Sequence, residues 1–235
     1  MARLLVTRPR DQATTTKALL EARGHQVSLE PVLSIHAVAH PAIDLSRFDG
    51  LAITSAHAAP AAAALRPDIP VFAVGDATAG ALKDNRVDAV SVGKAGGRAL
   101  AEDIDRALAG RKGQILHLTG RHRSGELEGA LTQRGHGYCT TIVYEARESE
   151  TISPETESLL VDNRLDGICF FSRRSAEIFC RLSLQDGLQG SFARLDAFCL
   201  ADTVAEGCAG LPWRQIRVAD APNVEALCHL LEQAW

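Results

Sequence analysis

An internal repeat is the feature that most constrains the fold. The tripeptide Arg-Gly-His begins at Arg23 and again at Arg134, 111 residues later. The same offset relates the apolar stretch RLLVTRPR from Arg3 to QILHLTGR from Gln114. Each stretch is followed by a helix-like segment, and the glycine of the tripeptide is typical of a helix C-terminus. The sequence therefore predicts two copies of a unit that runs strand, helix, glycine, strand.

Two further pairs of segments extend the repeat in the same order. DGLAITSAHAAPAA from Asp49 resembles DGICFFSRRSAEIF from Asp166, and VFAVGDATAGAL from Val71 resembles AFCLADTVAEGC from Ala197. Each segment reads as a buried strand, a turn and a helix. Chance similarity among short β/α segments is the alternative, but three pairs in one order favour a duplication.

Alternating strands and helices indicate parallel sheets that are covered by helices on both faces. We therefore predict an α/β protein with two flavodoxin-like, doubly wound parallel-sheet domains. The segments from Val32 and Ile142 become polar and extended without a helical period, so we expect the chain to cross twice between domains. The predicted domains are residues 1–36 plus 144–235, and residues 37–143; a single division near residue 112 is the alternative.

Composition narrows the classes of function. The 235 residues are 46% hydrophobic, with a net charge of −4, which argues against a protein that wraps nucleic acid. The apolar runs are too short to span a membrane, and the N-terminal MARLLVTRPRDQ is predicted to be a first strand instead of a signal peptide. The six cysteines lack a CxxC spacing, so we expect a cytoplasmic protein without disulfides or a zinc site.

The candidate site follows from the ends of the predicted strands. Open α/β sheets bind ligands beyond the carboxyl ends of their strands, and two such domains are expected to gather these ends in a cleft. Hydroxyls, small residues and arginines dominate there, which suits an anionic ligand. The strand-end residues are Thr7, Arg8, Thr54, Ser55, Gly75, Asp76, Thr119, Gly120, Arg121, Phe171, Ser172, Asp202 and Thr203.

Two helix starts carry alternative interpretations. Asp76 is expected to cap the helix that follows Gly75, which leaves Thr78 in the first turn as the better donor to a ligand. Ser55 and Ser172 are either helix caps or ligand donors. Neither serine lies in a GxSxG sequence, which disfavours a hydrolase.

The most basic loop is TGRHRSG from Thr119 to Gly125. It is either an anion clamp, through Arg121 and Arg123, or a solvated loop. It lacks the P-loop lysine and the GxGxxG spacing, so ATP and NAD are excluded as ligands. His117 and His122 straddle a strand end with no carboxylate to join them, so no metal site is expected.

One of the two tyrosines, Tyr144, lies in the second predicted crossing, in the segment IVYE. A phenol at that place can donate a proton to a ligand in the cleft. A half-buried aromatic residue at a hinge is the alternative.

Short segments spread along essentially the whole chain match the pattern of a known family. They are TRP from Thr7, PVLS from Pro31, DGLAITSAHA from Asp49, VFAVGDATA from Val71, ILHLTG from Ile115, the Gly135 turn, VYE from Val143, DGICFFSRRSA from Asp166 and VADAPNVEALCHLL from Val218. Through the order and spacing of these segments, the chain resembles the uroporphyrinogen-III synthase family. It departs from the family at Ala201–Asp202, where a glycine turn is usual, and at Arg173–Arg174, where small residues or proline are common.

The resemblance implies a fold and an activity. It implies two α/β domains joined by a two-stranded linker. It implies a cyclising lyase of haem biosynthesis that converts hydroxymethylbilane to uroporphyrinogen III, with loss of water and inversion of ring D, and without a cofactor or metal. The implied partners are the linear tetrapyrrole, with its eight carboxylates, and transiently porphobilinogen deaminase; we expect a monomer that binds neither nucleic acid nor membrane.

The resemblance also assigns roles to residues. Tyr144 matches a tyrosine that the family implicates in catalysis, and Thr78 and Thr203 match threonines of its two strand–turn–helix motifs. Ser55 and Ser172 are expected to bind substrate because of their positions. The alternative function is a non-catalytic cytosolic binding protein or sensor for an anionic metabolite held in the interdomain cleft.

Overall fold

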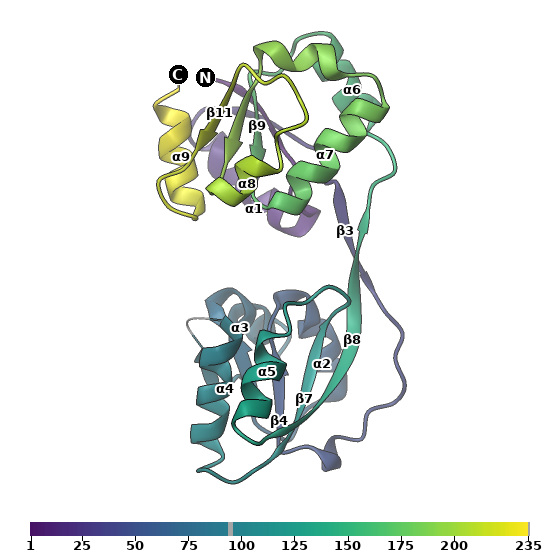
Figure 1. The fold of residues 1–235 in the computed structure, drawn as a ribbon, viewed down its shortest axis with the longest axis vertical. Coiled ribbons are helices and arrows are strands. Elements are labelled where there is room, and N and C mark those ends of the chain that lie inside the picture. Colours follow the sequence, from purple (N-terminus) through teal and green to yellow (C-terminus); the bar gives the residue numbers. More distant parts are fainter. Residues whose placement is uncertain (94–95, 235) are drawn as a thin grey trace. The chain divides into compact units, whose positions relative to one another are not determined.

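The chain builds two sheets from alternating strands and helices (Figure 1). The computed structural model describes residues 1–93 and 96–234. It divides into two compact units: unit 1 comprises residues 1–34 and 147–235, and unit 2 comprises residues 35–146. Each unit is described by itself below.

The elements of unit 1 alternate as the repeat predicts. They are β1 (Arg3–Val6), α1 (Arg10–Glu21), β2 (Gln26–Leu29), α6 (Pro154–Val161), β9 (Gly167–Phe170), α7 (Arg173–Gln185), β10 (Asp196–Cys199), α8 (Asp202–Glu206), β11 (Gln215–Val218) and α9 (Val224–Glu232).

Unit 2 follows the same alternation. Its elements are β4 (Gly50–Ile53), α2 (Ala59–Leu65), β5 (Val71–Val74), α3 (Gly75–Asp84), β6 (Ser91–Gly93), α4 (Gly96–Ala107), β7 (Gln114–Gly120) and α5 (Glu126–Gln133), with β3 (Leu33–Ala37) and β8 (Gly137–Glu148) running across the division between the units.

The two sheets have the same strand order when their strands are matched through the repeat. The order is β11-β10-β9-β1-β2 in the five-stranded sheet and β6-β5-β4-β7-β8-β3 in the six-stranded sheet. All strands except β3 pair in parallel. The topology agrees with the predicted duplication, and each unit combines the first part of one sequence copy with the second part of the other.

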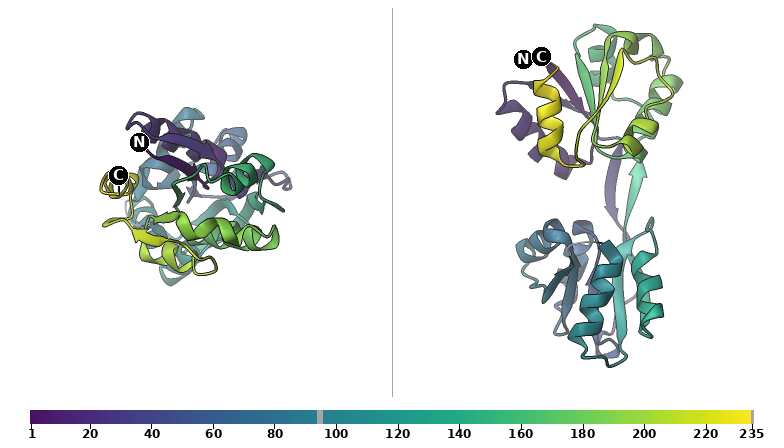
Figure 2. Two further views of the ribbon diagram at one scale, coloured as in Figure 1. Left: turned by 90° about the horizontal axis from the view of Figure 1, so that it is seen from above. Right: turned by 60° about the vertical axis from the view of Figure 1, so that its left-hand side comes forward.

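Helices cover both faces of each sheet (Figure 2). In unit 2, Leu51 and Ile53 pack with α2 and α3, whereas the intervening Ala52 packs with α4 and α5 on the opposite face. This alternation is the period of two that a strand imposes on its side chains. None of the helices described is both long and apolar enough to cross a membrane.

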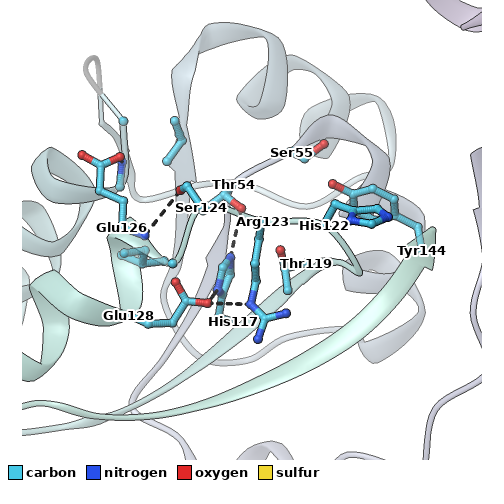
Figure 3. Close-up of a pocket in the computed structure, with 15 residues that line it drawn as sticks. Thr54, Ser55, His117, Thr119, His122, Arg123, Ser124, Glu126, Glu128 and Tyr144 are labelled. Atoms are coloured by element: carbon cyan, nitrogen blue, oxygen red, sulfur yellow. Dashed lines mark hydrogen bonds and ion pairs between the residues drawn. The ribbon is translucent and has the colours of Figure 1, made fainter. Parts of the chain in front are cut away.

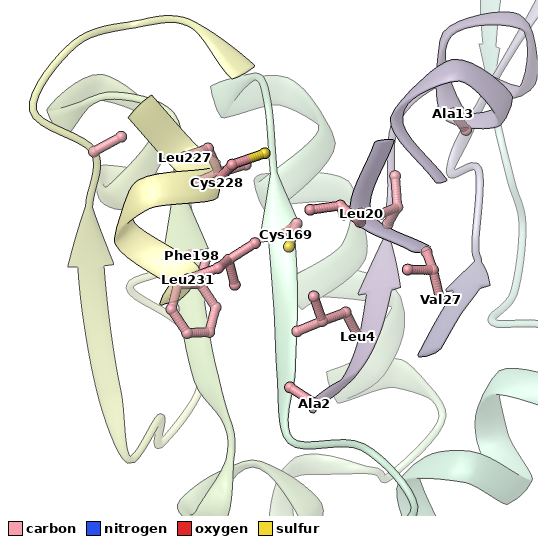
Figure 4. Packing of buried hydrophobic residues seen from close by; sticks show 12 residues of the cluster. Ala2, Leu4, Ala13, Leu20, Val27, Cys169, Phe198, Leu227, Cys228 and Leu231 are labelled. Carbon is pink, nitrogen blue, oxygen red and sulfur yellow. The ribbon is translucent and has the colours of Figure 1, made fainter. Parts of the chain in front are cut away.

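The core of unit 1 contains the strands that the sequence predicted to be buried (Figure 4). Leu4 of β1, Cys169 of β9 and Phe198 of β10 are fully buried, and Leu227 and Leu231 of α9 cover them. Burying each of these large apolar side chains contributes roughly 1.5–3 kcal/mol relative to leaving it exposed. The apolar strand sequences are therefore explained by helices on both faces of the sheet.

A glycine–phenylalanine contact occurs at the same place in both sheets. A methyl group on Gly50 would lie 2.8 Å from Cε2 of Phe72, and one on Gly167 would lie 2.6 Å from Cε2 of Phe198. Real Cβ atoms do not approach carbon so closely, because interiors are close-packed. The Asp-Gly pairs that begin β4 and β9 thus make room for a phenylalanine on the neighbouring strand.

The Arg-Gly-His tripeptides end their helices in the same way. Gly24 and Gly135 have positive φ of 85° and 78°. Their N–H groups donate to carbonyls three residues back, and the N–H groups of His25 and His136 donate to carbonyls five residues back, at 3.2 and 3.0 Å. These two bonds define a Schellman motif, so the predicted glycine C-caps are confirmed.

The predicted Asp76 cap is wrong. Helix α3 begins at Gly75, with Val74 at the N-cap and no side-chain cap bond. Gly75 has a φ of 74°, which allows the chain to turn from β5 directly into the helix. Asp76 therefore lies inside the first turn, where its charge faces the positive end of the helix.

Candidate functional site

A polar pocket lies at the carboxyl ends of the strands of unit 2 (Figure 3). Its volume is about 290 Å³. Side chains from β5, β7, β8 and α5, from the two residues after β4 and from the loop after β7 meet there. The lining residues are Thr54, Ser55, Val74, Gly96, Gly97, His117, Thr119, His122, Arg123, Ser124, Gly125, Glu126, Leu127, Glu128 and Tyr144.

Four side chains form a hydrogen-bonded chain along one wall of this pocket (Figure 3). Thr54 Oγ1 lies 2.9 Å from His117 Nε2, and His117 Nδ1 lies 3.3 Å from Glu128 Oε1. The same Glu128 oxygen accepts from Arg123 Nε at 3.0 Å. His117 is only 2% exposed and Glu128 only 7%. Buried polar groups need such partners, because an unpaired one costs roughly 1–3 kcal/mol.

The charges along the chain set the direction of its hydrogen bonds. Burial lowers the pKa of His117, so the imidazole is neutral near pH 7. Burial alone would raise the pKa of Glu128, but a bond to its own backbone N–H and the hydrogen bonds from Arg123 and His117 bring it below its ordinary value. An ionised Glu128 only accepts, so His117 Nδ1 donates to it, Nε2 accepts, and the Thr54 hydroxyl donates to Nε2.

Tyr144 reaches the pocket through an irregularity in β8. Gly120 pairs with Tyr144 while Thr119 pairs with Ile142, so β8 has one extra residue at this point. Such bulges change the direction of a side chain. The Tyr144 ring then covers Gly120, where a methyl group would lie 2.6 Å from Cζ, and it meets the edge of His57 at 5.4 Å between ring centroids.

The hydroxyl of Tyr144 makes no hydrogen bond to another described residue. The ring is partly exposed at the rim of the pocket. Gly120 is needed beside it because any larger residue would displace the ring. The two predicted site residues Tyr144 and Gly120 therefore lie in contact.

Both arginines of the basic loop are bound to acidic residues of their own unit. Arg121 Nε donates to Glu145 at 2.8 Å, and Arg123 Nε donates to Glu128. The loop is therefore anchored on Glu145 and Glu128. The Nη groups of Arg123 make no hydrogen bond to the described residues, so they are available to an anion.

Ser55 is confirmed as an N-cap, and its role as a ligand donor stays a prediction. Its Oγ accepts from the N–H of His57 as the N-cap of a short 3₁₀ turn, and it also lines the pocket. Gly75 and Thr78 lie on the neighbouring α3 and are not among the described residues that line it. Thr78 is buried, with 5% of its surface exposed.

The remaining predicted site residues lie in unit 1. Arg8 donates to Thr16 Oγ1 at 3.0 Å and lies 4.5 Å above the Phe171 ring. Ser172 is the N-cap of α7 and accepts from the N–H of Ser175 at 3.1 Å. Thr203 is exposed in the first turn of α8.

The sequence analysis missed Glu128 and therefore misjudged His117. The expectation that no carboxylate joins His117 is wrong, because α5 brings Glu128 back over β7. A signal was present in ELEGAL, where a glutamate interrupts the apolar face of a helix that must pack on a strand. Among the described residues, no group of three or more His, Cys, Asp or Glu side chains is arranged to hold a metal ion.

The fold and the pocket define a class: α/β proteins with two parallel-dominated sheets whose strand ends carry hydroxyls and arginines. The chain belongs to the uroporphyrinogen-III synthase (HemD) family, whose sequence model matches residues 14–229. The predicted family is thereby confirmed.

Solved structures show the same fold. Uroporphyrinogen-III synthetase from Helicobacter pylori is 17% identical, with all of both chains covered and a TM-score of 0.65. A mutant uroporphyrinogen III synthase from Thermus thermophilus is also 17% identical, with 100% of this chain and 98% of that chain covered and a TM-score of 0.53. No curated protein matches the chain.

Proposed function

We propose that this protein is a cyclising lyase that closes hydroxymethylbilane to uroporphyrinogen III with loss of water and inversion of ring D. The observation that carries the proposal is the family match over residues 14–229, together with Tyr144 at the rim of a polar pocket. The alternative, a binding protein without activity, has no observation that favours it.

Tyr144 is the proposed general acid. Its hydroxyl is not engaged by the described residues, and its ring is held at the pocket by Gly120 and His57. A phenol can protonate the hydroxyl that leaves the substrate, and a positioned acid typically contributes 10²–10⁴-fold in rate. The remainder of the task is to hold a long, flexible substrate in a curled conformation.

Hydroxyls, backbone N–H groups and arginines are the proposed ligands of the substrate carboxylates. They have in common a position at a strand end or in the first turn of a helix, where N–H groups and the helix dipole favour an anion. The proposed binding residues are Arg8, Ser55, Gly75, Thr78, Gly120, Arg121, Ser172 and Thr203.

The finer description of the fold is also a proposal. We propose two flavodoxin-like, doubly wound domains, of residues 1–36 plus 144–235 and of residues 37–143, joined by a linker of β3 and the end of β8. Counted along its own strands, the sheet of unit 1 has the order 2-1-3-4-5, which is the flavodoxin-like order. The hydrogen bonds from Val38 N–H to Val143 O, at 2.9 Å, and from Ser149 N–H to Val32 O, at 3.0 Å, lie on either side of β3 and support its pairing with β8.

The proposed setting is a monomer in the cytoplasm that receives its substrate from porphobilinogen deaminase. All six cysteines are free thiols, which suits a reducing compartment. Five of the six are buried and the sixth is Cys139. The coupling to the deaminase follows from the chemistry, because that enzyme class supplies the linear tetrapyrrole.

A coupled assay tests the proposal. Porphobilinogen and its deaminase generate the substrate in situ, and the oxidised products are separated into type I and type III uroporphyrin. Predominantly type III product is expected, whereas type I product equal to the blank would overturn the proposal. The Tyr144→Phe variant is expected to lower kcat about 10-fold or more, a barrier increase of about 1.4 kcal/mol; an unchanged kcat would remove Tyr144 as the acid.

A further inference from the structure

We propose that the unit 2 pocket holds the pyrrole ring that loses water, and that Thr54, His117 and Glu128 act as a chain that stabilises the positive charge of that ring as it forms. The inference rests on the proposed function and deepens it by naming the subsite and its polarity. The juxtaposition that carries it is Tyr144, the proposed acid, on the same pocket as the Thr54–His117–Glu128 chain (Figure 3).

The size of the pocket selects one ring. Its volume of about 290 Å³ lies at the lower end of the roughly 300–1,000 Å³ typical of pockets for drug-sized ligands. One pyrrole with its acetate and propionate groups is smaller than such a ligand, and four linked rings are larger. The pocket therefore takes a single substituted ring, while the rest of the substrate lies outside it.

The direction of the hydrogen bonds selects the group that the pocket recognises. Thr54 gives its proton to His117 Nε2, so the lone pairs of Thr54 Oγ1 are the part of this chain that is open to a ligand. A lone pair accepts from an N–H or O–H donor, and every pyrrole ring carries one N–H. The free Nη groups of Arg123 border the same pocket and suit a carboxylate of the ring.

The chemical step explains why a carboxylate is placed behind Thr54. In that step, the bond between the terminal CH₂ and its hydroxyl oxygen breaks, and the oxygen takes a proton from Tyr144 and leaves as water. The ring nitrogen supplies the electron pair, which leaves an azafulvenium cation whose N–H is a stronger donor than before. The substituted α-carbon of ring D, which has no hydrogen, attacks the terminal CH₂ to give a spiro intermediate, and its bond to the CH₂ that links it to the preceding ring then breaks. The unsubstituted α-carbon of ring D bonds to that CH₂ and loses its hydrogen, and this proton restores Tyr144.

Glu128 is aligned with this developing charge. The cation at the ring N–H is joined to the Glu128 carboxylate through Thr54 and the neutral imidazole of His117. Preorganised dipoles and charges that face developing charge lower a barrier most where water is excluded, and His117 and Glu128 are both buried. Glu128 and His117 are thus positioning residues, and Thr54 is the group that touches the ring.

A second pair in unit 2, between the buried His136 and the half-exposed Asp105, provides a control of the same chemistry. His136 Nε2 lies 2.9 Å from Asp105 Oδ1, and neither residue lines the pocket. Replacing Glu128→Gln or Asp105→Asn removes one charge beside a buried histidine in each case. A merely structural role predicts that the two variants change kcat to the same extent, in line with their losses of stability.

The test compares kcat and KM for wild type, Glu128→Gln, Asp105→Asn, Thr54→Val and Thr54→Ser in the coupled assay, with urea unfolding of each. We expect kcat to fall about 10-fold in Glu128→Gln and in Thr54→Val, with KM changed less than about twofold. Asp105→Asn should keep the wild-type kcat, and Thr54→Ser should restore most of it because the hydroxyl is retained.

The outcomes separate the inference from the function on which it rests. Type III product from the wild type, with an unchanged kcat in Thr54→Val, overturns the inference and leaves the proposed function standing. An equal fall of kcat in Asp105→Asn and Glu128→Gln also overturns it, because the effect is then structural. Type I product alone from the wild type overturns both. Thr54→Val keeps the inference falsifiable if Glu128→Gln does not fold.

Discussion

The two sheets are alike in topology and unlike in chemistry at their strand ends. Leu4 pairs with Gly167 in unit 1, as Ile115 pairs with Gly50 in unit 2, so positions can be matched one to one. The matched positions of Thr54, His117 and Glu128 are Phe171, Val6 and Lys17.

Unit 1 therefore cannot form the polar chain. Val6 is fully buried in the apolar core, and Phe171 supports the guanidinium of Arg8 instead of accepting a hydrogen bond. Lys17 pairs with Glu21 on the exposed side of α1, at 3.5 Å. The duplicated fold supplies two sheets of the same topology. At the matched positions, unit 2 carries the buried His117 and its partner Glu128, and unit 1 carries Val6 and Lys17.

The largest expected effect on activity comes from placing the residue of one unit at the matched position of the other. Thr54→Phe places the unit 1 residue at the end of β4, where it fills the pocket and removes the acceptor. We expect kcat/KM to fall roughly 100-fold, about 2.7 kcal/mol, in the coupled assay. The reciprocal Phe171→Thr should lower kcat/KM by less than about fivefold, because only the support of Arg8 is lost.

Equal losses in Thr54→Phe and Phe171→Thr would contradict the assignment of the polar chain to unit 2. Urea unfolding of both variants separates this result from misfolding. A Thr54→Phe protein with wild-type stability and low activity supports a filled pocket, since a side chain that cannot fit would also lower the unfolding free energy.

Much of this architecture could be predicted from the sequence because it depends on short segments whose residue pattern indicates a strand, a helix or a helix end. The repeated tripeptide gave the glycine caps Gly24 and Gly135, and the apolar runs gave the buried strands. Helix starts were less certain: Asp76 resembles an N-cap, but the positive φ of Gly75 allows α3 to begin with Val74 as its N-cap, two residues earlier. No local pattern reports the φ of a glycine.

Only part of the candidate site could be predicted from such sequence patterns. Thr54 and Gly120 lie at predicted strand ends, so the rule on strand ends found them. Tyr144 was found because it is one of only two tyrosines and lies in the second predicted crossing. Glu128 lies one loop and half a helix beyond His117, and their bond depends on how α5 packs against β7. A bond set by tertiary packing has no signature in spacing alone.

The glycine–phenylalanine contact allows the loss of stability on a glycine-to-alanine substitution to be compared between the two sheets. Gly167→Ala should destabilise more than Gly50→Ala, because its methyl group would also approach Phe198 Cδ2 at 3.0 Å and a backbone oxygen at 3.1 Å. The other atoms near Gly50 lie at 3.4 Å. Overpacking of this kind costs typically 1–3 kcal/mol. Urea unfolding monitored by circular dichroism measures it, and a smaller loss for Gly167→Ala would contradict the geometry.

Replacing the two histidines of the repeated tripeptide should change the free energy of unfolding by amounts that differ by about 1–2 kcal/mol. His136 is buried, accepts from the N–H of Gly113 at 3.2 Å and contacts Asp105, whereas Nδ1 of His25 is buried without a partner among the described atoms. His136→Leu leaves the Gly113 N–H unpaired and should destabilise. His25→Leu removes an unpaired polar atom and should be neutral or stabilising. Chemical unfolding of both variants decides the point, and equal losses would contradict it.

The smallest expected effect is the pH dependence that the polar chain gives to unit 2. Burial lowers the pKa of His117 below its ordinary 6.5, so the unfolded chain binds the proton more tightly. Stability from this group is present above pH 6.5 and is lost as the pH falls below that value, by at most about 1.4 kcal/mol per pH unit. The charged groups beside it are Glu128, which favours the protonated imidazole, and Arg123, which opposes it.

His117→Val, which installs the unit 1 residue, tests this dependence. Between pH 7 and pH 5.5 the unfolding free energy of the wild type should fall by up to about 1 kcal/mol more than that of the variant. The comparison uses the change of the unfolding free energy with pH and not its absolute value. The cavity that His117→Val leaves therefore does not affect the result. His25, whose pKa burial also lowers, is present in both proteins and cancels. Parallel curves would mean that the imidazole takes up a proton without cost, and Thr54 would then face a cation instead of the neutral acceptor that makes its oxygen available to the substrate.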